Sequence, residues 1–147
     1  MNKQVIIILE GSDGSGKTTL KKEIERLSNY KFIVIDRFTG SDIVYDRMFE
    51  RDNREDVLLQ LEEDMSKIAN VLLVYCYCDI DLQRGRLRSK GDDEDTIRSI
   101  EESNRLYGVY LEQTKFKTDF IDTSEPVQDC VNDILDSVIN AFGGKDE

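Results

Sequence analysis

Residues 11–18 read Gly11-Ser12-Asp13-Gly14-Ser15-Gly16-Lys17-Thr18 and fit the pattern G-x-x-x-x-G-K-[ST] of a phosphate-binding loop. Five apolar residues, Val5-Ile6-Ile7-Ile8-Leu9, precede them, as expected for a parallel strand that is covered on both faces. After them, Leu20, Ile24 and Leu27 recur at spacings typical of one helix face. A strand before the motif and a helix after it are the context that such a loop requires. The sequence therefore predicts a nucleotide site at this turn.

The chemistry of the motif assigns a role to each part of the loop. Its glycines let the backbone curl so that successive N–H groups point at phosphate oxygens, and the helix N-terminus adds positive potential. We expect Lys17 to reach the β- and γ-phosphates and the Thr18 hydroxyl to ligate Mg²⁺. The predicted nucleotide-binding residues are Gly11, Ser12, Asp13, Gly14, Ser15, Gly16, Lys17, Thr18 and Thr19. Motors, GTPases and kinases share this loop, so it does not define the reaction.

Composition narrows the class of protein and its partners. The chain has 147 residues, and we expect a single domain over residues 1–147. The net charge of −11 argues against long nucleic acid or a membrane surface as the main partner, but not against a small anionic ligand. The absence of histidine excludes triad hydrolases and most zinc enzymes. Cys76, Cys78 and Cys130 are expected to be reduced residues of a cytoplasmic protein.

Apolar runs and helical stripes alternate along the rest of the chain. Further strands are expected at residues 31–36, 71–77 and 116–122. Helices are expected at residues 54–69, 82–90, 97–111 and 127–142, with a partly helical stretch at 42–53 and a frayed tail at 145–147. This alternation predicts an α/β fold of the P-loop NTPase type, with three α/β/α layers and a parallel sheet of about four strands. Right-handed crossovers place the strand of residues 31–36 beside the first strand and the other two on its opposite side.

An aspartate, Asp36, stands at the C-terminal end of the second apolar run. Ligands of open α/β sheets bind at that end of the strands. We expect Asp36 to hold Mg²⁺ through water, as the second acidic element of a phosphate-loop site. In the alternative interpretation, Asp36 is only a turn residue that ends the strand.

The one strongly basic segment of this acidic chain is residues 84–90. Arg84 and Arg88 are four residues apart and share a helix face, whereas Arg86 points elsewhere. One interpretation is a solvated face that pairs with the acidic run at residues 92–95. The other is a lid, in which the guanidinium groups of Arg84 and Arg88 stabilise charge on the transferring phosphoryl group. The position of the segment after the third strand favours the lid.

Four segments occur in an order that resembles the thymidylate kinase family. They are residues 9–19 with the loop, Asp36-Arg37-Phe38-x-x-Ser41-x-x-x-Tyr45, Leu82-x-Arg84-x-Arg86-x-Arg88, and residues 121–127. The resemblance covers most of the chain. Their combination is much more specific than any single segment.

The resemblance implies a nucleoside monophosphate kinase that uses ATP and Mg²⁺. It implies that Arg37 binds the acceptor phosphate, which makes it a catalytic residue beside Lys17, Arg84 and Arg88. It also implies that Asp13 faces the acceptor sugar near the 3′-hydroxyl, which suits a deoxynucleotide such as dTMP. Ser41 belongs to the same motif as Arg37 and is expected at the substrate. The family is often dimeric, so a homodimer is a further expectation.

The chain departs from the family in one region. Only residues 20–31 separate the loop helix from the strand that ends at Asp36, where the family usually has another strand and helices. That part normally supplies an arginine for the acceptor phosphate and an aromatic residue for the base. Four aromatic residues could stack on a base in its place, Phe38, Tyr45, Phe49 and Tyr107. The interpretation favoured for each of them is an ordinary core or surface aromatic residue.

Three functions follow from these patterns. The first is a kinase of deoxynucleoside monophosphates, dTMP foremost. The second is a phosphate-loop kinase for a modified nucleotide or for a hydroxyl on a nucleoside or DNA end, with Asp13 or Asp36 as the base. The third is a nucleotide-binding interaction module that lacks an acceptor site.

Overall fold

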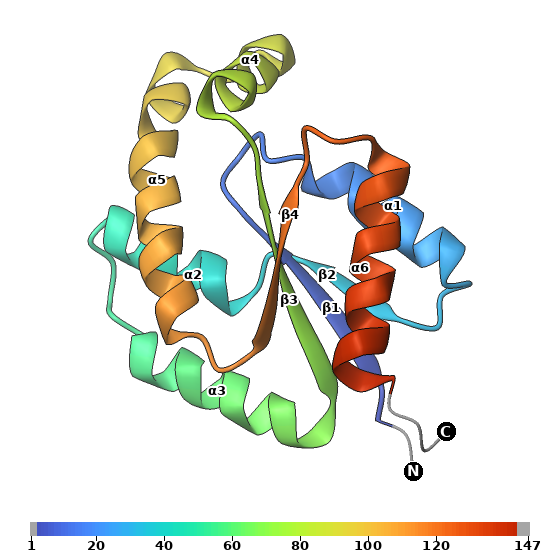
Figure 1. Cartoon of the computed structure of the whole chain (residues 1–147). Helices are drawn as coiled ribbons and strands as arrows, with labels where there is room; N and C mark the ends of the chain where they lie inside the picture. Colours follow the sequence, from blue (N-terminus) through green and yellow to red (C-terminus); the bar gives the residue numbers. More distant parts are fainter. Residues whose placement is uncertain (1–2, 144–147) are drawn as a thin grey trace.

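The computed structural model describes residues 3–143, which form four strands and six helices (Figure 1). The strands are β1 (Val5–Glu10), β2 (Ile33–Asp36), β3 (Asn70–Tyr77) and β4 (Lys117–Asp122). The helices are α1 (Lys17–Leu27), α2 (Thr39–Met48), α3 (Glu55–Ile68), α4 (Ile80–Lys90), α5 (Glu94–Gln113) and α6 (Val127–Phe142). The frayed tail expected at residues 145–147 lies outside the described residues.

The strands form one parallel sheet in the order β2-β1-β3-β4. Leu9 of β1 pairs in register with Asp36 of β2, and Glu10 of β1 pairs with Tyr75 of β3. The carboxyl ends of these three strands therefore meet at one edge of the sheet, where ligands of such folds bind. The predicted strand order is confirmed.

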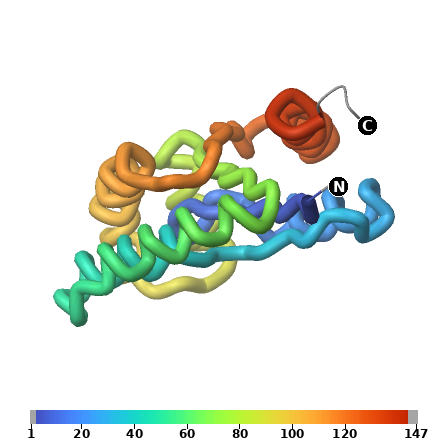
Figure 2. Tube along the Cα trace, turned by 90° about the horizontal axis from the view of Figure 1, so that it is seen from below, coloured from blue at the N-terminus to red at the C-terminus, as the bar shows by residue number. Residues whose placement is uncertain are grey.

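Two helical layers cover the sheet, so the predicted α/β/α architecture is confirmed. Ile7 and Leu9 pack with α1 and α6 on one face, whereas Ile8 packs with α2, α3 and α5 on the other. Figure 2 shows the layers from below, with α5 and α6 on opposite sides of the sheet. Both faces of β1 are buried, which explains the unbroken apolar run in its sequence.

Helix α2 differs from the expected partly helical stretch at residues 42–53, because it begins earlier and ends at Met48. Its first turn, Thr39, Gly40 and Ser41, is buried although none of these residues is strongly apolar. A Cβ atom on Gly40 would lie 2.6 Å from the ring of Tyr110, so α2 and α5 approach closely there. The buried face of α2 therefore carries small and polar residues in its first turn, beside the apolar core residues Ile43 and Val44.

The acidic run at residues 92–95 starts a helix. Gly91 ends α4 in the left-handed conformation, with φ of +82°. The carboxylate of Asp93 then accepts a hydrogen bond from the Thr96 N–H at 2.7 Å and caps α5. No helix among residues 3–143 is both long enough and apolar enough to cross a membrane.

Candidate active site

The phosphate-binding loop lies between the end of β1 and the start of α1. Gly11, Gly14 and Gly16 have φ of +146°, +80° and +89°, which side-chain-bearing residues rarely adopt. A Cβ atom at Gly11 would lie 2.5 Å from the Cys76 carbonyl oxygen of β3, so the loop passes directly against the sheet. These three positions therefore favour glycine, which the motif predicts for Gly11 and Gly16, whereas Gly14 stands at one of its variable positions.

Lys17, the first residue of α1, folds its side chain back into the loop. Its Nζ donates to the Gly11 carbonyl at 2.8 Å, to the Ser12 carbonyl at 3.3 Å and to the Ser15 hydroxyl at 3.2 Å. Burial lowers the pKa of this ammonium below its usual value, and the nearby charge of Arg37 lowers it further. A phosphate in the loop would offset both effects, because an anion stabilises the charged amine.

A cleft of about 820 Å³ opens beside the loop, a volume suited to a nucleotide. Of the predicted nucleotide-binding residues, those at 13–19 line it, whereas Gly11 and Ser12 are buried behind it. Its opposite side is built mainly from α4 and from the segment after β4, through Leu82, Gly85, Arg86, Ser89, Lys90, Thr123, Glu125 and Val127. We call this the first cleft.

The two predicted metal-binding residues, Thr18 and Asp36, both line the first cleft. The Asp36 Oδ1 is buried and has no hydrogen-bond partner within residues 3–143. Mg²⁺ prefers oxygen ligands and usually retains water while also binding substrate phosphates, so a few protein oxygens suffice. No group of three or more His, Cys, Asp or Glu side chains suited to a metal occurs in that part of the chain. The residues present therefore fit a magnesium ion held jointly with phosphates.

Arg37 follows β2 directly and adopts φ of +70°, an uncommon conformation for a residue with a side chain. Its N–H donates to the Leu9 carbonyl at 2.9 Å, which fixes the backbone against β1. Its guanidinium donates to the Tyr45 hydroxyl at 2.7 Å and forms an ion pair with Asp13. The conformation thus aims the guanidinium at the phosphate-binding loop.

A second cleft, of about 500 Å³, lies on the other side of this ion pair. Asp13 and Arg37 line both clefts. The remaining lining residues come from the end of α2 and from α5, and they are Tyr45, Met48, Phe49, Arg51, Thr96, Ser99, Ile100 and Ser103. The α5 residues could not be recognised from the sequence, because they are small polar side chains and an isoleucine in an amphipathic helix.

Ser41 lies behind the clefts and lines neither of them. Its hydroxyl donates to Glu10 Oε1 at 2.5 Å and its N–H donates to Glu10 Oε2 at 3.0 Å. The same carboxylate accepts the N–H of Phe38 at 2.8 Å, so it caps α2, which has no side-chain cap of its own. Ser41 and Glu10 therefore hold the segment that carries Arg37, and Ser41 does not reach the expected substrate position.

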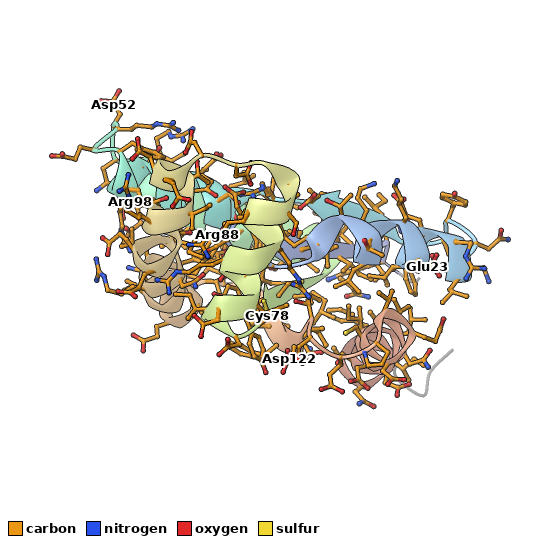
Figure 3. The ribbon with its side chains drawn as sticks, turned by 90° about the horizontal axis from the view of Figure 1, so that it is seen from above. Glu23, Asp52, Cys78, Arg88, Arg98 and Asp122 are labelled. Carbon is orange, nitrogen blue, oxygen red and sulfur yellow. The ribbon has the colours of Figure 1, made fainter. Side chains whose placement is uncertain are left out.

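Of the three arginines on α4, only Arg86 lines the first cleft. It donates to the Gly14 carbonyl at 3.1 Å and to the Thr123 carbonyl at 2.8 Å. Arg84 instead lies 3.6 Å from Glu101, and Arg88 lies 3.9 Å from Glu94. Figure 3, which labels Arg88, shows it on the helix that passes over the upper end of the sheet.

These positions differ from the lid interpretation, in which Arg84 and Arg88 face the phosphates. Arg88 pairs with Glu94 of the acidic run, as the alternative interpretation expects, whereas Arg84 pairs with Asp81 and Glu101, which lie outside that run. The common face of the two arginines points away from the cleft because Gln83 and Leu87 occupy the buried side of α4. The α4 arginine that lines the cleft is Arg86, whose spacing from its neighbours gave no reason to choose it.

A family model for thymidylate kinase matches residues 20–134. The chain belongs to the thymidylate kinase family. As a member of that family it is a nucleoside monophosphate kinase, and the resemblance found in the sequence is confirmed. A search of curated proteins found no match.

Solved structures similar to this thymidylate kinase family member share its fold. YorR protein from Bacillus subtilis, solved with phosphorylated GDP, is 24% identical, with a TM-score of 0.78 over 90% of this chain and 95% of its own. Deoxyadenosine kinase from M. mycoides with bound dCTP is 14% identical, with a TM-score of 0.68 over 92% and 99%. Polyphosphate Kinase 2 from Arthrobacter aurescens TC1 is 14% identical, with a TM-score of 0.68 over 99% and 70%.

Proposed function

We propose that this kinase transfers the γ-phosphoryl group of ATP to the 5′-phosphate of a deoxynucleoside monophosphate, with dTMP as the first acceptor to test. The bond between the γ-phosphorus and the β–γ bridging oxygen breaks, a bond to an acceptor phosphate oxygen forms, and ADP leaves. The observation that supports this reaction is the pair of clefts that share Asp13 and Arg37. One cleft suits the donor and the other suits the acceptor.

The donor half rests on the phosphate-binding loop. Loop N–H groups and Lys17 would bind the β- and γ-phosphates. Arg86 would hold α4 against the loop through its hydrogen bond to the Gly14 carbonyl. Mg²⁺, when bound by Thr18 and through water by Asp36, would neutralise charge on the transferring group. All of these residues except Arg86 were predicted from the sequence.

The acceptor half rests on the ion pair of Arg37 and Asp13. Arg37 would bind the acceptor phosphate and hold it in line with the γ-phosphate, since a planar guanidinium matches two phosphate oxygens. Asp13, partly exposed, would accept a hydrogen bond from the 3′-hydroxyl of a deoxynucleotide. An acceptor phosphate is already ionised, so the reaction needs no strong base and a chain without histidine can perform it.

We extend the proposal to the organisation of the protein. Residues 1–147 act as one domain, because both clefts are built on the same sheet. The cysteines are free thiols, and Cys76 and Cys130 are buried, which suits the cytoplasm. A homodimer stays a prediction from the family resemblance.

Replacement of Lys17 tests the reaction. We expect Lys17→Ala to lower turnover at least about 100-fold, because a charge contact to the transferring phosphoryl group is lost. Lys22→Ala is the matched control, since Lys22 is exposed on the same helix and should keep wild-type turnover. A coupled assay of ADP release measures both variants. Wild-type turnover in Lys17→Ala would refute the assignment.

A further inference from the structure

The first half of the phosphate-binding loop is a β-turn. The Ser15 N–H donates to the Ser12 carbonyl at 3.2 Å, which places Asp13 and Gly14 at the centre of the turn. Gly14 has φ of +80°, whereas φ of Asp13 is not positive. This combination matches a type II turn, in which the third residue is usually glycine. A type I turn differs from it by a rotation of the central peptide, here the one between Asp13 and Gly14.

A buried glutamine of α4 holds this central peptide in its type II orientation. Gln83 is 2% exposed, and its Nε2 donates to the Asp13 carbonyl at 2.6 Å. Its Oε1 accepts a hydrogen bond from the Asn104 Nδ2 of α5 at 3.0 Å. A carbonyl can only accept, so the nitrogen of Gln83 must face Asp13 and its oxygen must face Asn104. The two amide side chains therefore connect α5 to the loop through α4.

The turn lies directly against α4. A Cβ atom on Gly14 would lie 2.9 Å from the Gln83 carbonyl oxygen and 3.1 Å from Leu87 Cγ. Leu87 packs with Ile97 and Ile100 of α5, so the two helices form one support behind the loop (Figure 1). Gln83 itself lines neither cleft. It can therefore influence a bound nucleotide only through the loop.

The direction of the Asp13 carbonyl decides where the next N–H points. In a planar trans peptide the C=O and the N–H point in opposite directions. Because the Asp13 carbonyl faces Gln83, the Gly14 N–H points away from Gln83. This N–H donates to no group within residues 3–143, and Gly14 lines the first cleft. It is therefore available to a phosphate oxygen of a nucleotide in that cleft.

We propose that Gln83 is a positioning residue that selects the type II turn and so presents the Gly14 N–H to a phosphate of the bound nucleotide. The inference rests on the proposed function and adds a residue outside both clefts on which the donor site depends. Without Gln83 the Asp13 carbonyl loses its partner, and rotation of the peptide would turn this oxygen toward the phosphates. Glycine accepts φ of either sign, so Gly14 alone does not prevent the rotation. Asn104 contributes by orienting the Gln83 amide.

The first test replaces Gln83 by methionine, which keeps the length of the side chain but has no N–H donor. Calorimetric titration with ADP and Mg²⁺ should show a Kd about tenfold higher in Gln83→Met, the effect of losing one hydrogen bond to a charged group. Gln60→Met on α3 is the control, because it loses only an exposed bond to Asp64 and should bind ADP as wild type does. Asn104→Leu should raise the Kd less, and the double variant should match Gln83→Met alone, since Asn104 acts through Gln83.

A spectroscopic test separates positioning from a general loss of stability. In proton–nitrogen correlation NMR spectra at saturating ADP and Mg²⁺, the Gly14 amide proton of the wild-type protein should move downfield, because hydrogen bonds to charged oxygens are short and strong. Gln83→Met should lose this shift, while the amides of Lys17 and Thr18 still respond to ADP.

Three results would overturn the proposal. They are a wild-type Kd for ADP in Gln83→Met, an unchanged shift of the Gly14 amide in that variant, and a loss of response at Gly14, Lys17 and Thr18 alike, which would mean that the whole loop is disrupted. These measurements need no acceptor. If no monophosphate were phosphorylated by the wild-type protein, the proposed function would fail, whereas the role of Gln83 would still be decided by the binding and the NMR data.

Discussion

Arg37 pairs with Asp13 at the boundary between the two clefts, while its other terminal nitrogen donates to the Tyr45 hydroxyl at 2.7 Å. Both members of the pair are groups that we propose to bind the acceptor. The pair therefore keeps the guanidinium between the clefts when no acceptor is bound. An arriving nucleotide would offer its phosphate to Arg37 and its sugar hydroxyl to Asp13.

We predict that Arg37→Lys lowers kcat/KM for the acceptor about 100-fold. Lysine keeps the charge but cannot hold two phosphate oxygens at once, so in-line orientation is lost. Steady-state kinetics with the best acceptor measures the effect. Arg98→Lys, an exposed position on α5, should retain wild-type values. An unchanged kcat/KM in Arg37→Lys would place the acceptor phosphate elsewhere.

Ser41→Ala should affect stability more than substrate binding. The change removes a buried hydroxyl that donates to Glu10 at 2.5 Å, and loss of one partner of a buried hydrogen bond costs about 1–3 kcal/mol. Urea unfolding should show this loss, while the KM for the acceptor stays within about twofold of wild type. Ser28→Ala, which loses only a 3.3 Å bond to the Glu25 carbonyl, should cost less. A large rise in KM at unchanged stability would restore Ser41 to the substrate site.

Among the arginines of α4, Arg86→Ala should cause the largest defect. It removes the contacts to Gly14 and Thr123, so we expect the KM for ATP to rise about tenfold, the effect of losing one charged hydrogen bond. The lid interpretation predicts a fall in kcat for Arg84→Ala and Arg88→Ala, whereas the carboxylate-paired arrangement predicts little change. The same assay on all three variants distinguishes these outcomes. A defect in Arg84→Ala that exceeds the one in Arg86→Ala would show that α4 rearranges on binding.

Asp36→Asn should raise the Mg²⁺ concentration needed for half-maximal activity by about 10–100-fold, the usual cost of losing an outer-shell ligand. The change removes the charge of a carboxylate whose Oδ1 has no hydrogen-bond partner in residues 3–143. Activity is titrated with Mg²⁺ at fixed ATP. Asp64→Asn on the exposed side of α3 should leave the titration unchanged. Identical curves for Asp36→Asn and wild type would refute a metal role.

The sheet and the conformation of the phosphate-binding loop could be predicted from the sequence for physical reasons. A parallel strand covered on both faces must be continuously apolar, so β1 and β3 were recognisable and their order followed from crossover handedness. The loop was recognisable because its glycines have left-handed backbone conformations that few other residues tolerate.

The acceptor half could not be predicted in the same way, because its features depend on tertiary contacts. The first turn of α2 packs on two buried carboxylates, Glu10 from β1 and Glu62 from α3, and shows no apolar stripe. Arg86 is held at the cleft by a hydrogen bond to the carbonyl of Thr123, a residue that is far away in the sequence. The second cleft brings Phe49 and Arg51 to α5 only when the fold is complete.

A coupled assay with ATP, Mg²⁺ and each common nucleoside and deoxynucleoside monophosphate tests the central claim most directly, with the products separated by chromatography. We predict that at least one deoxynucleoside monophosphate strongly stimulates ADP formation and is converted to its diphosphate in equal amount. Slow ATP hydrolysis that no monophosphate stimulates would contradict the kinase assignment and favour a nucleotide-binding interaction module.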